Sequence, residues 1–151
     1  MNHFDVAAGI LRDASGRVLV AERLGGGPYH GMWEFPGGKI GQGETAAQAL
    51  TRELAEEIGV IVTQYASFMN LRHEYEDRIV TIEFFIASAW NGEPIGCEGQ
   101  ALRWVAAEEL HTVNLLPADE PVIAALRSEA ASGVGADSVA AASVGAASSR
   151  D

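Results

Sequence analysis

The sequence predicts an α/β domain in which helices pack against a mixed β-sheet. Short apolar stretches bounded by turn residues occur on both sides of residue 50, and they are typical of β-strands. Between them lies one strongly amphipathic stretch with helical periodicity, and a second helical stretch covers residues 118–129. Strands, a central helix, more strands and a late helix together favour a layered α/β arrangement.

The chain begins with two predicted strands. Residues 5–12 (DVAAGILR) and 16–23 (GRVLVAER) are mostly apolar and are separated by the turn sequence DASG. The glycine-rich segment 24–32 (LGGGPYHGM) then leads into WEFPGGKIGQGE at residues 33–44. We expect both segments to be loops, because glycine allows the backbone to turn tightly and to approach a ligand closely.

Residues 45–58 form the most clearly predicted helix. Four apolar side chains recur at helical spacing and make one apolar stripe, namely Ala47, Leu50, Leu54 and Ile58. Thr45 or the residue before it is suited to cap the start of this helix, and Gly59 is suited to end it. We therefore expect this helix to pack on the sheet through its apolar stripe.

A long β-hairpin is predicted after this helix. Residues 67–75 (SFMNLRHEY) and 78–90 (RIVTIEFFIASAW) flank a polar turn at Glu76 and Asp77. The turn sequence NGEP follows, and residues 101–105 (ALRWV) read as a short strand. Residues 106–112 are predicted to form at most a short helix.

The last predicted helix and the tail set the domain boundary. Residues 118–129 have a helical pattern with Pro121 in the first turn, where proline is tolerated. From residue 131 the chain is rich in Ala, Ser, Gly and Val and lacks the large side chains that a core requires. We predict one domain over residues 1–130 and a disordered tail over residues 131–151.

Composition narrows the compartment and the partners. The 151 residues carry a net charge of −11 and one cysteine, Cys97. A single cysteine excludes an internal disulfide framework, and no apolar run reaches the length of a membrane span. The first residues lack a basic region and a cleavage pattern, so we expect no signal peptide. A strongly acidic chain is unsuited to binding long nucleic acid through a basic patch. We expect a monomeric, cytoplasmic protein that binds no membrane.

Three carboxylates at the end of the predicted helix indicate a cation site. Glu53, Glu56 and Glu57 fall on one face at about 100° per residue, away from the apolar stripe. Like charges at this spacing repel, and the dipole at a helix C-terminus also disfavours them. A solvated acidic face is the simpler interpretation. The nearby Glu44 and the glycine-rich segment instead favour a bound Mg²⁺, which prefers oxygen ligands and retains sites for substrate phosphates.

Residues 38–60, GKIGQGETAAQALTRELAEEIGV, resemble the signature of the Nudix hydrolase family. That signature has a glycine, a glutamate six positions later, Arg-Glu after seven more residues, then Glu-Glu and a final glycine. This sequence matches it without departure, at Gly38, Glu44, Arg52, Glu53, Leu54, Glu56, Glu57, Gly59 and Val60. The segments WEFPGGKI (33–40), WNGEP (90–94), EGQ (98–100) and LPADEPVIAAL (116–126) are similar to the branch that hydrolyses 8-oxo-dGTP.

The resemblance implies a fold and a reaction. The fold would be an α/β/α sandwich around a mixed sheet, and the reaction would be hydrolysis of a nucleoside triphosphate to the monophosphate and pyrophosphate. The implied cofactor is Mg²⁺, with Mn²⁺ as a substitute. The implied metal ligands are the Gly37 carbonyl, Glu53, Glu56, Glu57 and Glu98. Glu53 is our first choice for the general base, and Glu98 is the other carboxylate with an expected catalytic role.

The remaining residues of the signature and the substrate pocket have separate expected roles. Gly38, Glu44, Arg52 and Gly59 would support the signature, with a salt bridge between Glu44 and Arg52. The resemblance implies four substrate-binding residues, namely Arg23, Phe35, Arg78 and Asp119. Arg78 and Arg23 also have the simpler interpretation of solvated arginines.

Asp119 leaves the base preference open. The 8-oxo-dGTP branch has an asparagine here, and an amide offers both a donor and an acceptor. A carboxylate accepts the N7–H of 8-oxoguanine but repels O6 unless burial keeps it protonated. It also suits the amino group of cytosine, and a Nudix branch that acts on CTP has a similar PAD sequence. The first hypothesis is therefore a nucleotide-pool enzyme for 8-oxo-dGTP, the second is the same chemistry on CTP or modified dCTP, and the third is a non-catalytic nucleotide sensor.

Overall fold

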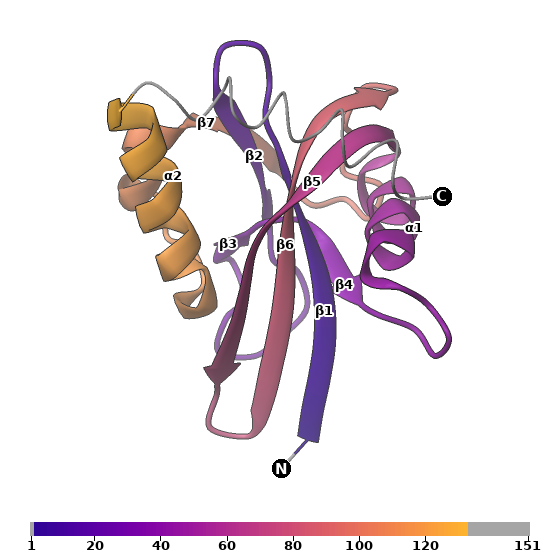
Figure 1. The fold of residues 1–151 in the computed structure, drawn as a ribbon. Coiled ribbons are helices and arrows are strands. Elements are labelled where there is room, and N and C mark those ends of the chain that lie inside the picture. Colours follow the sequence, from indigo (N-terminus) through magenta and orange to yellow (C-terminus); the bar gives the residue numbers. More distant parts are fainter. Residues whose placement is uncertain (1, 133–151) are drawn as a thin grey trace.

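The computed structural model describes residues 2–132 and contains two β-sheets between two helices (Figure 1). The four-stranded sheet has the order β4-β1-β6-β5, formed by Gly37–Lys39, Asn2–Leu11, Arg78–Asn91 and Ile61–Glu74. The three-stranded sheet has the order β3-β2-β7, formed by Trp33–Glu34, Arg17–Glu22 and Leu102–Ala106. The helices α1 (Ala46–Ile58) and α2 (Glu120–Ser132) lie on opposite sides (Figure 1).

The expected mixed sheet is the four-stranded one. β1 pairs in parallel with β6, from Asn2 beside Arg78 to Leu11 beside Ala87, whereas β4 and β5 are antiparallel to their neighbours. The sequence did not predict the second sheet. The turn after β1 redirects the chain, so that β2 joins β7 and a single bridge, Arg12 to Val18, connects it to the first strand.

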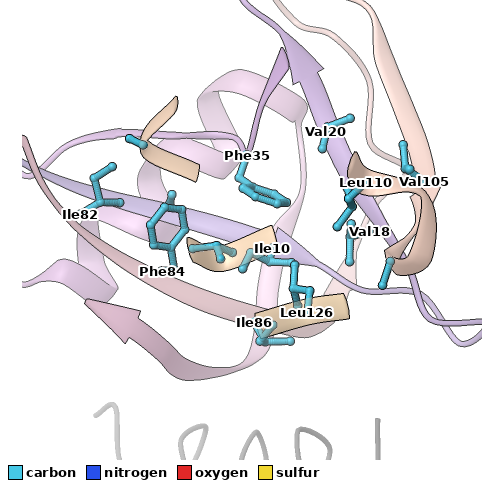
Figure 2. Packing of buried hydrophobic residues seen from close by; sticks show 14 of the residues in the cluster. Ile10, Val18, Val20, Phe35, Ile82, Phe84, Ile86, Val105, Leu110 and Leu126 are labelled. Carbon is cyan, nitrogen blue, oxygen red and sulfur yellow. The ribbon is translucent and has the colours of Figure 1, made fainter. Parts of the chain in front are cut away.

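Burial on both faces explains the apolar runs in the strands. Along β6, Phe84 and Ile86 belong to the core cluster that includes residues of α2, whereas Phe85 belongs to the cluster beside α1. Figure 2 shows the α2-side cluster, where Ile10, Phe84 and Leu126 lie together. Strands that are covered on both faces lack the polar alternation of a half-exposed sheet.

The helix α1 has the predicted caps. The Thr45 hydroxyl accepts from Gln48 N and the Gln48 side chain accepts from Thr45 N, which together make a capping box. Gly59 is left-handed at φ 72°, and its N–H donates to the Ala55 carbonyl. Ala49 is fully buried with Leu50, Leu54 and Ile58, while the predicted stripe residue Ala47 is only partly buried.

The remaining elements follow the predicted order with shifted bounds. The hairpin strand β5 begins at Ile61, six residues before the expected start, and residues 107–112 and 117–119 form short 3₁₀ helices, η1 and η2. α2 starts at Glu120 and has Pro121 in its first turn, as expected, and it continues through Ser132. The rest of the predicted tail, residues 133–151, lies outside the described residues. No helix within residues 2–132 is long and apolar enough to cross a membrane.

Candidate active site

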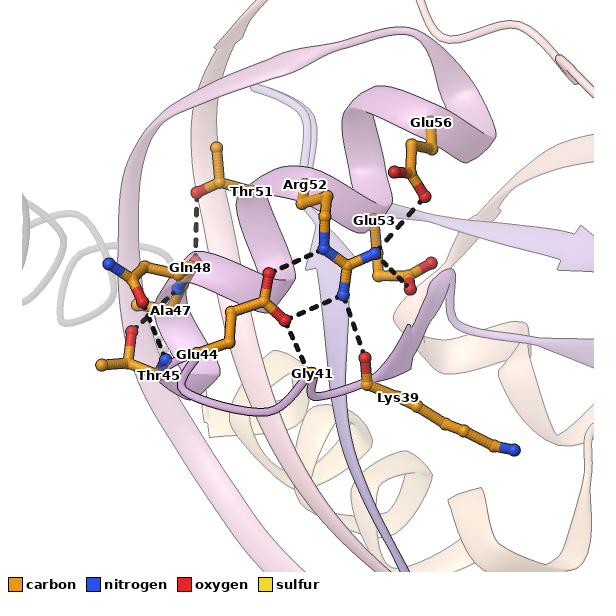
Figure 3. A network of polar contacts seen from close by, with 10 residues as sticks. All are labelled: Lys39, Gly41, Glu44, Thr45, Ala47, Gln48, Thr51, Arg52, Glu53 and Glu56. Atoms are coloured by element: carbon orange, nitrogen blue, oxygen red, sulfur yellow. Dashed lines mark hydrogen bonds and ion pairs between the residues drawn. The ribbon is translucent and has the colours of Figure 1, made fainter.

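Arg52, the arginine of the signature, links residues 39–44 to α1 (Figure 3). Arg52 donates to both Glu44 carboxylate oxygens, over 2.7 Å from Nε and 2.9 Å from Nη2, and its Nη2 also donates to the Lys39 carbonyl over 3.1 Å. Hydrogen bonds from Arg52 and from Gly41 N lower the pKa of Glu44 to about 2. The expected salt bridge is therefore present, and it fixes residues 39–44 against the helix.

The same guanidinium also contacts the acidic face of α1. Its Nη1 donates to Glu53 over 2.9 Å and lies 3.4 Å from Glu56 Oε1. The Glu53 side chain is 16% exposed and that of Glu56 is 60% exposed. Arg52 thus reduces the repulsion among three carboxylates, and it orients Glu53 toward the interior of the site.

Glu57 lies beside this network without a cationic partner. No arginine, lysine or histidine within residues 2–132 forms an ion pair with it. Burial raises the pKa of Glu57 to about 9, and a hydrogen bond with Glu53 and the charges of Glu53, Glu34 and Glu98 act in the same direction. Glu57 is therefore mostly protonated at neutral pH when no cation is bound.

The predicted ligands share one region but do not yet converge. Within the part of the chain that the structure describes, no three acidic, histidine or cysteine side chains form a ready-made metal cluster. Arg52 holds the Glu53 and Glu56 carboxylates, and Glu53 also forms a hydrogen bond with Glu57. The donor set fits a hard divalent ion, since it consists of carboxylate oxygens.

Two glycines bring a strand close to the acidic helix. A Cβ at Gly37 would lie 2.2 Å from the Ala7 carbonyl oxygen, and a Cβ at Gly38 would lie 2.4 Å from Glu53 Cδ. These residues form β4, which pairs with β1 at this point, so the expectation of a loop over residues 37–39 was wrong. Glycine is required here by close packing on both faces of the strand, not by a turn.

A cavity of about 230 Å³ opens beside this strand. Three of the four predicted substrate-binding residues line it, namely Arg23, Phe35 and Asp119. Phe35 is buried and packs edge-on against Phe84, with ring centroids 6.2 Å apart. Gly37 and Gly38 line the same cavity, so it extends from the apolar core to the strand that packs against Glu53 of α1.

Asp119 is the buried polar group of this cavity. Its side chain belongs to the 3₁₀ turn Pro117–Asp119, the residue is 4% exposed, and Oδ2 has no hydrogen-bond partner within the described residues. Burial, assisted by the charge of Glu34, raises the pKa of Asp119 to about 8. The side chain is therefore mostly protonated at neutral pH and can donate a hydrogen bond.

Comparison with known proteins identifies the family. A family model described as NUDIX domain matches residues 2–126. This chain belongs to the Nudix family. The match confirms the assignment made from residues 38–60, and with it the reading of the chain as a hydrolase.

Individual Nudix relatives cover most of the chain. An 8-oxo-dGTP diphosphatase from Escherichia coli (strain K12) is 39% identical over 127 residues, which are 84% of this chain and 98% of that protein. A CTP pyrophosphohydrolase from the same strain is 34% identical over 125 residues, which are 83% and 92% of the two chains. A solved structure from a study of MutT from Aliivibrio salmonicida and Vibrio cholerae has 31% identity and a TM-score of 0.75, and the match covers 85% of this chain and 99% of that one.

Arg78 is the predicted substrate residue that does not line the cavity of this Nudix domain. Its guanidinium carbon lies 4.8 Å from the centroid of the Tyr75 ring, which itself lines the cavity. Tyr29, from the segment before β3, packs against Tyr75 at 5.4 Å between centroids. Arg78 therefore contacts the cavity wall through Tyr75.

Two cavity residues were not anticipated from the sequence. Glu34 accepts a hydrogen bond from Arg23 over 3.0 Å, and burial raises its pKa although the Arg23 charge opposes this. Its position in an apolar run directly before the paired glycines was the available signal. The second unanticipated cavity residue is Tyr75, at the tip of the hairpin. An aromatic residue beside a polar turn is only a weak signal of a binding site.

Proposed function

We propose that this Nudix hydrolase removes 8-oxo-dGTP from the nucleotide pool in a Mg²⁺-dependent reaction in the cytoplasm. The observation that carries the proposal is the cavity, which is lined by apolar residues and the buried Asp119 and also by Gly37 and Gly38, of which Gly38 packs against Glu53 of α1. A nucleoside triphosphate has the matching chemistry, with anionic phosphates at one end and a flat, hydrogen-bonding base at the other. Hydrolysis of the oxidised nucleotide would prevent its misincorporation during DNA replication.

The phosphate end would be organised by one helix, one strand and one loop. Glu53, Glu56 and Glu57 of α1, Glu98 and the Gly37 carbonyl would hold Mg²⁺ or Mn²⁺. When bound, the ion would offset phosphate charge and make a nearby water molecule more acidic. The proton that Glu57 carries would be released on binding, so affinity should rise with pH.

The reaction requires a base for water and an orientation for the phosphates. Glu53 would accept a proton from the attacking water, with Glu98 as the second carboxylate that acts on it. The water oxygen forms a new bond to phosphorus while the α–β phosphoanhydride bond breaks, and the products are the monophosphate and pyrophosphate. Arg52 would keep Glu53 in position, since its Nη1 donates to that carboxylate.

The base end would read an oxidised purine through donors and acceptors. A protonated Asp119 has one O–H donor for O6 and a carbonyl oxygen that accepts N7–H, which is the pattern of an asparagine amide. Phe35 supplies an apolar wall, and Arg23 lies at the cavity beside Glu34. Arg78 would act through Tyr75 or on the exposed side of the base.

The same pocket keeps CTP, or a modified dCTP, as a second candidate. An ionised Asp119 would accept from the amino group of cytosine, and the 34% identical relative named CTP pyrophosphohydrolase gives this reading independent support. The protonation state of Asp119 in the complex therefore separates the two substrates. Both candidates use the same phosphate chemistry.

The deciding experiment measures kcat/KM for 8-oxo-dGTP, dGTP and dCTP in parallel with Mg²⁺. We expect 8-oxo-dGTP to exceed dGTP by about a hundredfold, roughly 2.7 kcal/mol of transition-state discrimination. A higher value for dCTP would refute the oxidised-purine proposal and support the second candidate. Binding without turnover of any of the three would point to a sensor instead, and Glu53→Gln provides the matched inactive control.

A further inference from the structure

Gln100 is a buried polar residue in the loop that carries Glu98. It is 7% exposed, and both ends of its amide are used. Its Oε1 accepts from Glu98 N over 2.9 Å, and its Nε2 donates to the Glu57 carbonyl over 3.0 Å. One side chain therefore connects the backbones of two acidic residues that are far apart in the sequence.

The surrounding loop is docked on the end of α1. Ile95 N donates to the Ile58 carbonyl over 3.0 Å, and Cys97 N donates to the Glu57 carbonyl over 3.0 Å. These bonds satisfy carbonyls at the helix end that have no partner within the helix. A Cβ at Gly96 would lie 2.0 Å from the Gln100 carbonyl oxygen, so the loop and Gln100 are packed without space for a side chain.

We propose that Gln100 is a positioning residue that sets the distance and direction between the carboxylates of Glu98 and Glu57. The inference rests on the proposed function, in which these two carboxylates hold the divalent ion. Glu98 is exposed, and within the described residues its side chain has no ion pair or hydrogen bond to orient it. Its placement therefore depends on its backbone, which Gln100 fixes relative to α1.

An amide suits this position because it has both an acceptor and a donor. Gln100 supplies the acceptor for the Glu98 N–H and a second donor for the Glu57 carbonyl, which also accepts from Cys97 N. Groups that orient metal ligands from behind typically change metal affinity by about ten- to a hundredfold when they are removed. A residue that served only to cap the helix would change stability but would not act through Glu98.

The test is a double-mutant cycle with Mn²⁺ alone as the probe, measured on the full chain by electron paramagnetic resonance of free Mn²⁺. The variants are Gln100→Met, which keeps length and volume but has neither hydrogen bond, Glu98→Gln, and the double variant. Gln48→Ala is the matched control, because its side chain caps the other end of the same helix. Gln100→Ala replaces Gln100→Met if the methionine variant does not fold.

We expect Gln100→Met to weaken Mn²⁺ binding by about tenfold in the parent chain and by less than about twofold when Glu98 is already Gln. Gln48→Ala should lower Tm and leave Mn²⁺ affinity unchanged. An equal loss in both backgrounds, or a loss of Tm without a change in affinity, would overturn the positioning role while leaving the metal site intact. Absence of Mn²⁺ binding in the parent, or no effect of Glu98→Gln, would overturn the proposed site itself.

Discussion

Replacing Asp119 with asparagine tests whether the base pocket contains a protonated carboxylic acid. Asparagine has nearly the same shape and cannot ionise. Burial and the charge of Glu34 raise the pKa of Asp119 from 3.8 in the unfolded chain to about 8 in the folded protein. Between these values the folded state holds a proton that the unfolded state has released, so stability falls as pH rises.

The pKa values determine the size of the effect. Each pH unit within this window costs the parent about 1.4 kcal/mol relative to Asp119→Asn. From pH 5 to pH 8 the variant should therefore gain up to about 4 kcal/mol over the parent. The two proteins should have similar stability near pH 4, and the difference should level off above pH 8, where the aspartate is ionised in both states.

Urea denaturation at pH 5, 6.5 and 8, followed by tryptophan fluorescence, measures this difference. Asp13→Asn is the control of opposite sign. Although burial raises the pKa of Asp13, hydrogen bonds from Ser15 and Arg17 outweigh this and lower it. The stability that the ionised Asp13 contributes is lost only when pH falls below the ordinary pKa of an aspartate. Asp13→Asn should therefore be equally destabilising at all three pH values. A pH-independent difference between Asp119→Asn and the parent would refute the protonated acid.

Three further predictions concern the acidic end of the site. Saturating Mg²⁺ should raise the Tm of the parent, because a ligand at a hundred times its Kd stabilises the folded state by about 2.7 kcal/mol. Glu57→Gln should remove this rise in a thermal-shift assay. Gly38→Ala should displace the Glu53 carboxylate, because a Cβ at this position would otherwise lie 2.4 Å from Glu53 Cδ, and it should lower kcat by about a hundredfold while circular dichroism stays unchanged; a parental kcat would contradict the packing argument. Glu34→Gln should remove a charge that raises the pKa of Asp119, so the alkaline limb of kcat/KM for 8-oxo-dGTP should move to lower pH; a limb at the parental pH would contradict the coupling.

The sequence predicted local features well because they depend on neighbouring residues. The cap at Thr45 and the end of α1 at Gly59 follow from spacing within one segment, and the pairing of Glu44 with Arg52 was implied by the resemblance to the Nudix signature. The division into two sheets was not predicted, because strand pairing depends on contacts between distant parts of the chain. The burial of Asp119 was likewise unavailable, because an acidic residue at the start of a predicted helix is ordinarily exposed.

The contrast between two glutamates of the signature explains how the site tolerates its charge. Glu44 receives two bonds from Arg52 and has its pKa lowered to about 2, whereas Glu57 has its pKa raised to about 9. A protein that needed only stability would place a basic residue beside Glu57, as it does beside Glu44. Arg52 instead fixes the supporting loop, and within residues 2–132 no cationic side chain pairs with Glu57 or Glu98. The burial of Glu57 without a cationic partner therefore agrees with the proposed function, in which the cation arrives together with the substrate.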